Sequence, residues 1–133
     1  MTEQEPYADD GSPFPTTYYL TCPQAVAAVS RLESSGGVER WSAAAAADPD
    51  LHASLETATK DQKELRRELA GGHVGSDGGA LVELGIGGSS SPLQLKCLHA
   101  HVAFALARPV YLLGDRILTE LGPLFPEDGC CTD

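Results

Sequence analysis

The sequence has little positive charge: it contains 9 Lys and Arg residues against 19 Asp and Glu residues, a formal net charge of −10. Proteins that bind nucleic acid hold phosphates on a basic face, so this balance argues against DNA or RNA binding. The chain also lacks the apolar run of about 18 residues that a membrane span requires. Its acidic start, MTEQEPYADD, is unlike the basic and then apolar start of a signal peptide. We therefore expect a soluble cytoplasmic protein.

The length and the distribution of charge indicate a single domain. A chain of 133 residues has room for one hydrophobic core. The two ends of the chain carry seven of its acidic residues and none of its basic residues. We expect residues 1–10 to form an acidic disordered leader, residues 11–122 a globular domain, and residues 123–133 a flexible acidic tail.

Residue patterns predict an α+β fold: a mainly helical domain of four or five helices with a small two-stranded sheet. β-Branched and aromatic residues predict strands at 16–21 and 80–86. Apolar periodicity, together with Pro and Gly at the boundaries, predicts the helices. Their expected ranges are 23–35, 38–47, 49–70, 93–107 and 110–121.

The helix expected at 49–70 has the most regular pattern in the chain. Asp48 is its expected N-cap, and Gly71 and Gly72 end it. A heptad stripe lies along one face, while charged residues, Arg66 among them, occupy the others. Such a stripe fits packing within a monomer, and it also fits a homodimer formed through this helix. The stripe consists of Leu51, Leu55, Ala58, Gln62, Leu65 and Leu69.

Cysteine and histidine residues form the first candidate site. On a continuous helix, Cys97 and His101 lie together at i, i+4, whereas His99 points away from them. Cys22, at the start of another helix, gains thiolate character from the helix dipole. Zinc held by Cys22, Cys97, His101 and a cysteine of the tail is one reading. A small buried thiol beside two surface histidines is the other.

The same residues support a different alternative, a thiol-dependent enzyme that acts on a phosphate- or acyl-containing small molecule. In that hypothesis, Cys97 or Cys22 is the nucleophile and His99 the general base. Phosphate-loop, serine-hydrolase and metalloprotease motifs are absent from the sequence, and no carboxylate is visibly placed to orient the histidine.

A glycine- and serine-rich loop forms the second candidate site. Backbone N–H groups, serine hydroxyls, a helix N-terminus and a lysine could together bind a phosphate or carboxylate, although a flexible helix cap is the simpler reading. The anion-binding candidates are Gly87, Gly88, Ser89, Ser90, Ser91 and Lys96. We expect an interaction or regulatory module whose polar Cys/His/Lys cleft binds an anion, a metal or a protein partner.

Three segments resemble a family of short bacterial proteins, common in actinobacteria, whose function is unknown. The segments are FPTTYYLTCP at 14–23, AVSRLE at 28–33 and KCLH at 96–99. Genes of this family often lie near those for a septum-formation-initiator-like protein and an exopolyphosphatase. The resemblance covers residues 11–122 and implies that Cys22, Lys96, Cys97 and His99 are the positions that the family marks out. It also implies that Gly114 and Asp115 match a Leu-Gly-Asp stretch.

The chain departs from the family pattern at two places. An Arg-Cys-x-Cys-like segment near the start is absent, and Phe104 stands where relatives carry a further histidine. If the family binds metal through those groups, zinc binding in this chain depends on His101 or on the Cys130-Cys131 tail.

Overall fold

The computed structural model describes residues 2–3, 18–71, 85–88 and 95–122. Two short strands pair antiparallel, with Thr2 opposite Tyr19 and Glu3 opposite Tyr18. The remaining described elements are five α-helices and one 3-10 turn. In chain order the elements are β1 (Thr2–Glu3), β2 (Tyr18–Tyr19), α1 (Pro23–Ser34), α2 (Gly37–Ala47), α3 (Pro49–Ala70), η2 (Ile86–Gly88), α4 (Leu98–Ala107) and α5 (Leu112–Leu121).

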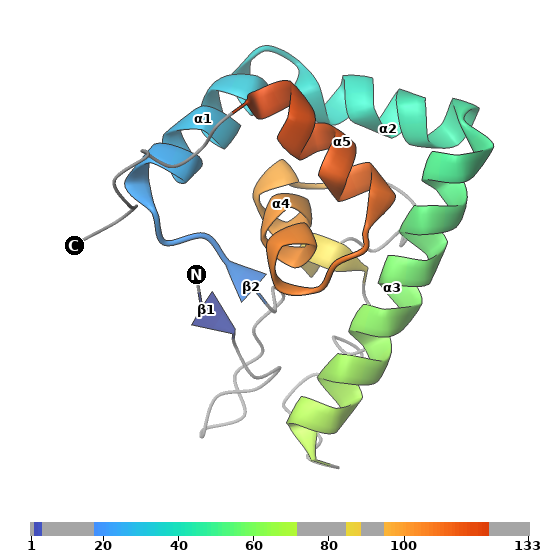
Figure 1. Cartoon of the computed structure of the whole chain (residues 1–133). Helices are drawn as coiled ribbons and strands as arrows, with labels where there is room; N and C mark the ends of the chain where they lie inside the picture. The colour runs from blue at the N-terminus through green and yellow to red at the C-terminus, as the bar shows by residue number, and fades with distance from the viewer. Residues whose placement is uncertain (1, 4–17, 72–84, 89–94, 123–133) are drawn as a thin grey trace.

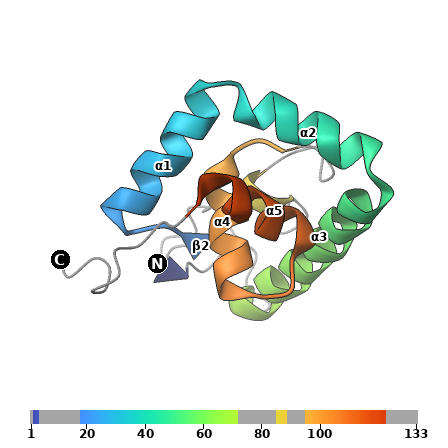
Figure 2. The ribbon, with the colours of Figure 1, turned by 45° about the horizontal axis from the view of Figure 1, so that its top comes forward.

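Helix α4 is the centre of the fold. Its sequence, LHAHVAFALA, is apolar on all sides, and a helix of this kind is stable only when its neighbours cover it. Figure 1 shows α4 enclosed by α1, α2, α3 and α5, and Figure 2 shows the same arrangement from another direction. Phe104 of α4 makes edge-to-face ring contacts with Tyr18 and Tyr111 at centroid distances of 6.0 and 5.7 Å.

The three helices that precede α4 follow the sequence prediction closely. Helix α1 begins at Pro23, and α2 and α3 lie within a residue of their expected ranges. Asp48 caps α3 because its Oδ1 accepts the N–H groups of Asp50 and Leu51 at 2.9 and 3.4 Å. Gly71 ends this helix in the left-handed conformation, with φ of 59°.

The heptad stripe of α3 packs within the chain. Leu51, Leu55, Ala58 and Gln62 are buried against the remainder of the domain. The exposed position expected for Arg66 is wrong, since this side chain has an exposed fraction of 0 %. The oligomeric state stays a prediction.

Other boundaries differ from the sequence prediction. The helix expected from residue 93 begins only at Leu98, because Cys97 has an extended backbone with φ of −152° and ψ of 126°. Val110, expected on the packed side of the last helix, lies before α5 and is 89 % exposed. Ile86 belongs to η2 instead of the predicted strand at 80–86. The strand paired with β2 is β1, which lies inside the predicted leader.

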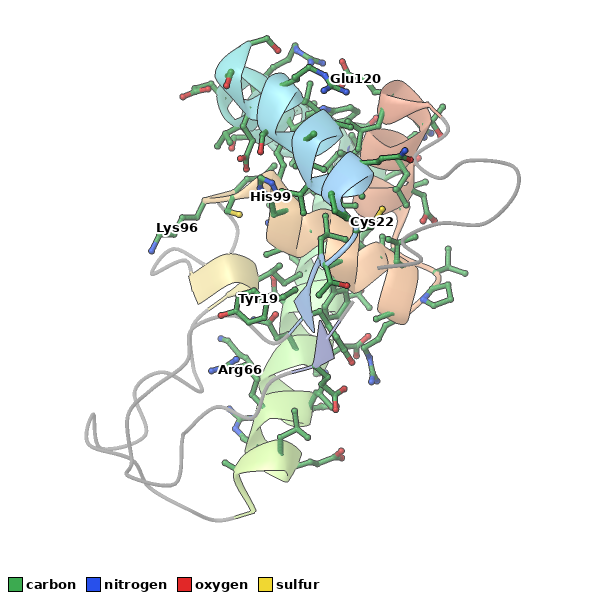
Figure 3. All side chains as sticks on the ribbon, turned by 90° about the vertical axis from the view of Figure 1, so that its left-hand side faces the viewer. Tyr19, Cys22, Arg66, Lys96, His99 and Glu120 are labelled. Carbon is green, nitrogen blue, oxygen red and sulfur yellow. The ribbon has the colours of Figure 1, made fainter. Side chains whose placement is uncertain are left out.

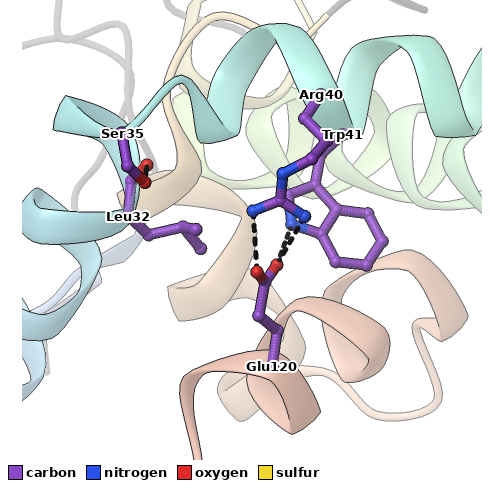
Figure 4. Close-up of polar contacts among 5 residues, drawn as sticks. All are labelled: Leu32, Ser35, Arg40, Trp41 and Glu120. Atoms are coloured by element: carbon purple, nitrogen blue, oxygen red, sulfur yellow. Dashed lines mark hydrogen bonds and ion pairs between the residues drawn. The ribbon is translucent and has the colours of Figure 1, made fainter.

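A polar cluster joins α2 to α5 at the surface. Glu120 of α5 accepts two hydrogen bonds from Arg40, at 3.0 and 2.7 Å, and one from Trp41 Nε1 at 2.7 Å (Figure 4). The pair is largely exposed, so solvent screens it and its contribution to stability is modest. Within the described part of the chain, no helix is both long and apolar enough to cross a membrane.

Candidate functional site

Three potential metal ligands meet where the end of α1 faces the start of α4. They are Glu33, Cys97 and His99, and one donor atom from each lies within 4.8 Å of the other two. All three side chains are partly exposed. The group joins segments more than sixty residues apart in the sequence, so the packing of α1 against α4 brings its members together.

Glu33 contacts the first turn of α4 with both of its carboxylate oxygens. Its Oε2 accepts the backbone N–H of Leu98 at 2.7 Å, and its Oε1 lies 3.0 Å from His99 Nδ1. The first turn of a helix has unsatisfied N–H groups and a positive dipole end, both of which favour a carboxylate there. Glu33 is therefore held in place by the helix that it caps.

His99 is oriented through its second ring nitrogen. Nε2 lies 3.3 Å from the carbonyl oxygen of Val26 and 3.3 Å from Ser30 Oγ. The carbonyl oxygen of Val26 and the carboxylate oxygen of Glu33 can only accept, so Nε2 and Nδ1 each face an acceptor. Residues of α1 thus fix the rotation of the imidazole.

Cys97 is a free thiol at the N-cap position of α4. Burial raises its pKa, the N–H groups of Ala100 and His99 oppose that rise, and the Glu33 carboxylate adds to it. A thiol with these surroundings is a poor nucleophile on its own, because its proton is harder to remove. A bound metal cation would reverse this balance and deprotonate the sulfur.

The two cysteines singled out in the sequence lie at opposite ends of α1. Cys22 precedes its first residue, whereas Cys97 is grouped with Glu33 in its last turn. Eleven residues of helix separate these ends by about 16 Å. Cys22 is also disulfide-bonded, so in this form its sulfur is neither a thiolate nor a metal ligand.

His101 lies in the core, apart from this cluster. It is 1 % exposed, and its Nδ1 lies 2.7 Å from the hydroxyl of Tyr111. The helix begins too late for the expected i, i+4 pair, since Cys97 lies before its first turn. His99, which was expected to point away from Cys97, is the histidine grouped with it.

Gly87, which belongs to the expected anion-binding loop, packs against the first turn of α4 beside Cys97. A Cβ at Gly87 would lie 3.3 Å from Ala100 Cβ and 3.8 Å from Cys97 Cβ, and its φ of +74° also favours glycine. Lys96 is exposed, and Figure 3 shows its side chain directed away from His99. Among the anion-binding candidates, Ser89, Ser90 and Ser91 lie outside the described residues, as do the cysteines of the tail.

Glu33 is the member of the cluster that sequence reasoning did not assign to a site. It lies within a segment that carried the family resemblance, but its helix has no pattern typical of metal binding. Only the pairing of α1 with α4 gives Glu33 this role, and no local signal predicts that pairing.

Comparison with protein families supports the resemblance. A model described as a protein of unknown function (DUF501) matches residues 2–119. The chain belongs to this family. The match covers helices α1 to α4 completely and α5 as far as residue 119, and therefore both segments that form the Glu33, Cys97 and His99 cluster. No curated protein and no solved structure matches the chain.

Proposed function

We propose that this member of the DUF501 family binds a divalent metal ion, with zinc as the preferred ion, through Glu33, Cys97 and His99. The observation that carries the proposal is the convergence of three different donor atoms within 4.8 Å. In a tetrahedral zinc site, neighbouring nitrogen and oxygen ligands are separated by about 3.4 Å. The 3.0 Å between His99 Nδ1 and Glu33 Oε1 requires only a small rotation to reach that value.

The chemistry of the donor set favours zinc over the hard cations. Magnesium and calcium prefer sites made entirely of oxygen atoms, whereas zinc accepts thiolate, imidazole and carboxylate ligands. The contact from His99 Nε2 to the Val26 carbonyl is the kind of outer contact that orients a metal-binding histidine. Three protein ligands leave a fourth position for water or an exogenous group.

The fourth coordination position of the metal connects the proposed metal site to the polar cleft that the sequence predicts. A small anion or a donor atom from a protein partner could occupy it, and either would suit an interaction or regulatory module. The burial of Cys97 and the adjacent Glu33 carboxylate favour a metal ligand over a metal-free cysteine nucleophile. We therefore rank the thiol-dependent enzyme second. The cytoplasmic location remains a proposal.

Zinc titration of the chelator-treated full chain tests the site. We expect one equivalent of zinc to bind, and Co²⁺ in its place to give the sulfur-to-metal absorption band of a thiolate ligand. Cys97→Ser and Glu33→Gln should each weaken binding by more than about 100-fold, because losing a group that merely orients a ligand costs 10- to 100-fold. Glu33→Gln keeps a side-chain oxygen for the N–H of Leu98, so the helix cap survives.

A surface histidine provides the matched control. His52 Nε2 lies 2.8 Å from Glu56 Oε1 on the exposed face of α3. Among the described residues, no cysteine joins this His–Glu pair in a group of potential metal ligands. His52→Gln should leave zinc affinity unchanged. The proposal is overturned if Cys97→Ser and Glu33→Gln bind zinc as tightly as the parent chain. Such a result would leave Glu33 as a helix cap that also pairs with His99.

A further inference from the structure

A groove on the other side of α4 is a second candidate binding site. It has a volume of about 560 Å³ and lies between α3 and the segment that joins α4 to α5. This size is typical of sites for small molecules, which occupy about 300–1,000 Å³. The alanines Ala53, Ala58 and Ala107 line it, so short side chains leave the space open. Its apolar surface continues over Val110 and Leu112.

The groove also carries one acidic and one basic side chain on facing elements. Asp61 lies on α3, and Arg108 follows the last residue of α4. Both are exposed, and within the described residues they form no ion pair with each other. Arg108 is hydrogen-bonded to Tyr18, and the pKa of the guanidinium is raised by this bond and by the charges of Asp61 and Glu3. The two groups therefore offer opposite charges to a ligand in the groove.

We propose that this groove binds a free α-amino acid with an apolar side chain. The carboxylate of the ligand would contact Arg108, its ammonium group would contact Asp61, and its side chain would lie along Ala53 and the rim residue Val110. A ligand that carries both charges matches both protein groups, whereas a purely anionic ligand would meet the Asp61 carboxylate. The proposal uses no residue of the metal cluster and goes beyond the function proposed above.

Three related molecules test the ligand class. L-Leucine is titrated into the chelator-treated chain by calorimetry, beside 4-methylpentanoate, which lacks the ammonium group, and 3-methylbutylamine, which lacks the carboxylate. We expect L-leucine to bind at least about tenfold more tightly than either analogue, because each analogue leaves one charged protein group without its contact. Equal affinity for the amine and L-leucine would overturn the proposal, as would no binding of L-leucine.

Variants place the ligand in the groove. Arg108→Gln and Asp61→Asn should each weaken L-leucine binding by about tenfold or more. Ala53→Leu adds bulk at an exposed helix position, so it should block the groove while the chain keeps its circular dichroism spectrum. Arg31→Gln removes an exposed arginine of α1 and should leave binding unchanged. Undiminished binding to folded Ala53→Leu would show that the ligand lies elsewhere and overturn the proposal.

Discussion

His101 is a fully buried titratable residue that is neutral in the folded chain. Burial lowers its pKa to about 3. Nδ1 shares a hydrogen bond with the hydroxyl of Tyr111, and Nε2 is buried without a hydrogen-bond partner. A buried polar atom without a partner costs about 1–3 kcal/mol. This histidine therefore packs in the core at the cost of one unpaired polar atom. Because its pKa is lowered by burial, the stability of the fold depends on pH.

We predict that His101 destabilises the fold as the pH falls. Between about pH 6.5 and 3 the unfolded chain binds a proton at this position and the folded chain does not. The packing of neutral His101 therefore contributes fully to the free energy of unfolding above pH 6.5. Below pH 6.5, the free energy of unfolding falls by about 1.4 kcal/mol for each pH unit. The double variant His101→Phe, Tyr111→Phe removes both partners of the hydrogen bond, so no polar group of that pair is left buried. As the pH falls, the free energy of urea unfolding should decrease less steeply for this double variant than for the parent chain.

The single variants serve as controls for this pH effect. His101→Phe leaves the Tyr111 hydroxyl without its partner, and the same reasoning predicts a loss of about 1–3 kcal/mol at pH 7. If the double variant and the parent chain lose stability in parallel from pH 6.5 to 3, His101 is not the source of the acid sensitivity.

Arg66 shows why single positions were hard to assign from the sequence. Charged side chains on a helix are almost always exposed, so the pattern predicted a solvent-facing position. The structure buries Arg66 completely on α3. Burial of an arginine depends on what surrounds it, and a helical pattern describes only the helix itself.

At the scale of elements, the sequence predicted helix boundaries best where a capping residue marks them. Asp48, Pro49 and Gly71 mark α3, and its predicted and observed bounds agree. At α4, the helix was expected to begin at residue 93, but it begins at Leu98. Glu33 caps the start of α4 from another helix, and such a tertiary cap has no sequence signal near the helix that it caps. Because α4 begins at Leu98 and not at residue 93, His99 and not His101 lies beside Cys97.

The contact between α4 and α5 depends on the absence of a side chain at Gly114. A Cβ there would lie 2.6 Å from Ala105 Cβ and 2.7 Å from Tyr111 Cδ2. Gly114→Ala gains about 1 kcal/mol of helix propensity, but overpacking a tight core costs about 1–3 kcal/mol. Overpacking should dominate here, because Ala105 Cβ is fixed to its backbone and the Tyr111 ring is buried.

We therefore predict that Gly114→Ala lowers the free energy of unfolding by about 1–2 kcal/mol, measured by chemical denaturation. Thr119→Ala, at an exposed position on the same helix, controls for changes in the stability of α5 itself. An increase in stability for Gly114→Ala would mean that α4 and α5 are less closely packed than in the structure.

For the whole molecule, the sequence predicted a mainly helical domain and the family, but it did not predict how the helices pack. Composition and periodicity identified five helices without ordering them in space. The cluster of Glu33, Cys97 and His99 is a product of that order, because α1 packs on α4. The disulfide at Cys22 was likewise not predicted, since Cys22 was expected to be a thiolate or a metal ligand.

Metal binding at this cluster should stabilise the entire domain. The ligands belong to α1 and to the start of α4. Helix α4 packs against α1 and α5, and these two helices in turn pack against α2 and α3 respectively. An ion that binds only the folded chain adds about 2.7 kcal/mol when its free concentration is 100 times its dissociation constant. For a domain of this size, that gain raises the melting temperature by several degrees. Thermal unfolding with and without zinc measures the increase.

The variants decide whether that stabilisation comes from the proposed ligands. Zinc should raise the melting temperature of His52→Gln as much as that of the parent chain, and it should not raise that of Cys97→Ser. Cys97→Ser without zinc should unfold near the apo parent chain, because serine is also a favoured N-cap residue. An equal zinc-dependent increase in all three chains would instead assign the stabilisation to other residues, and Glu33 would then stabilise α4 only as its cap.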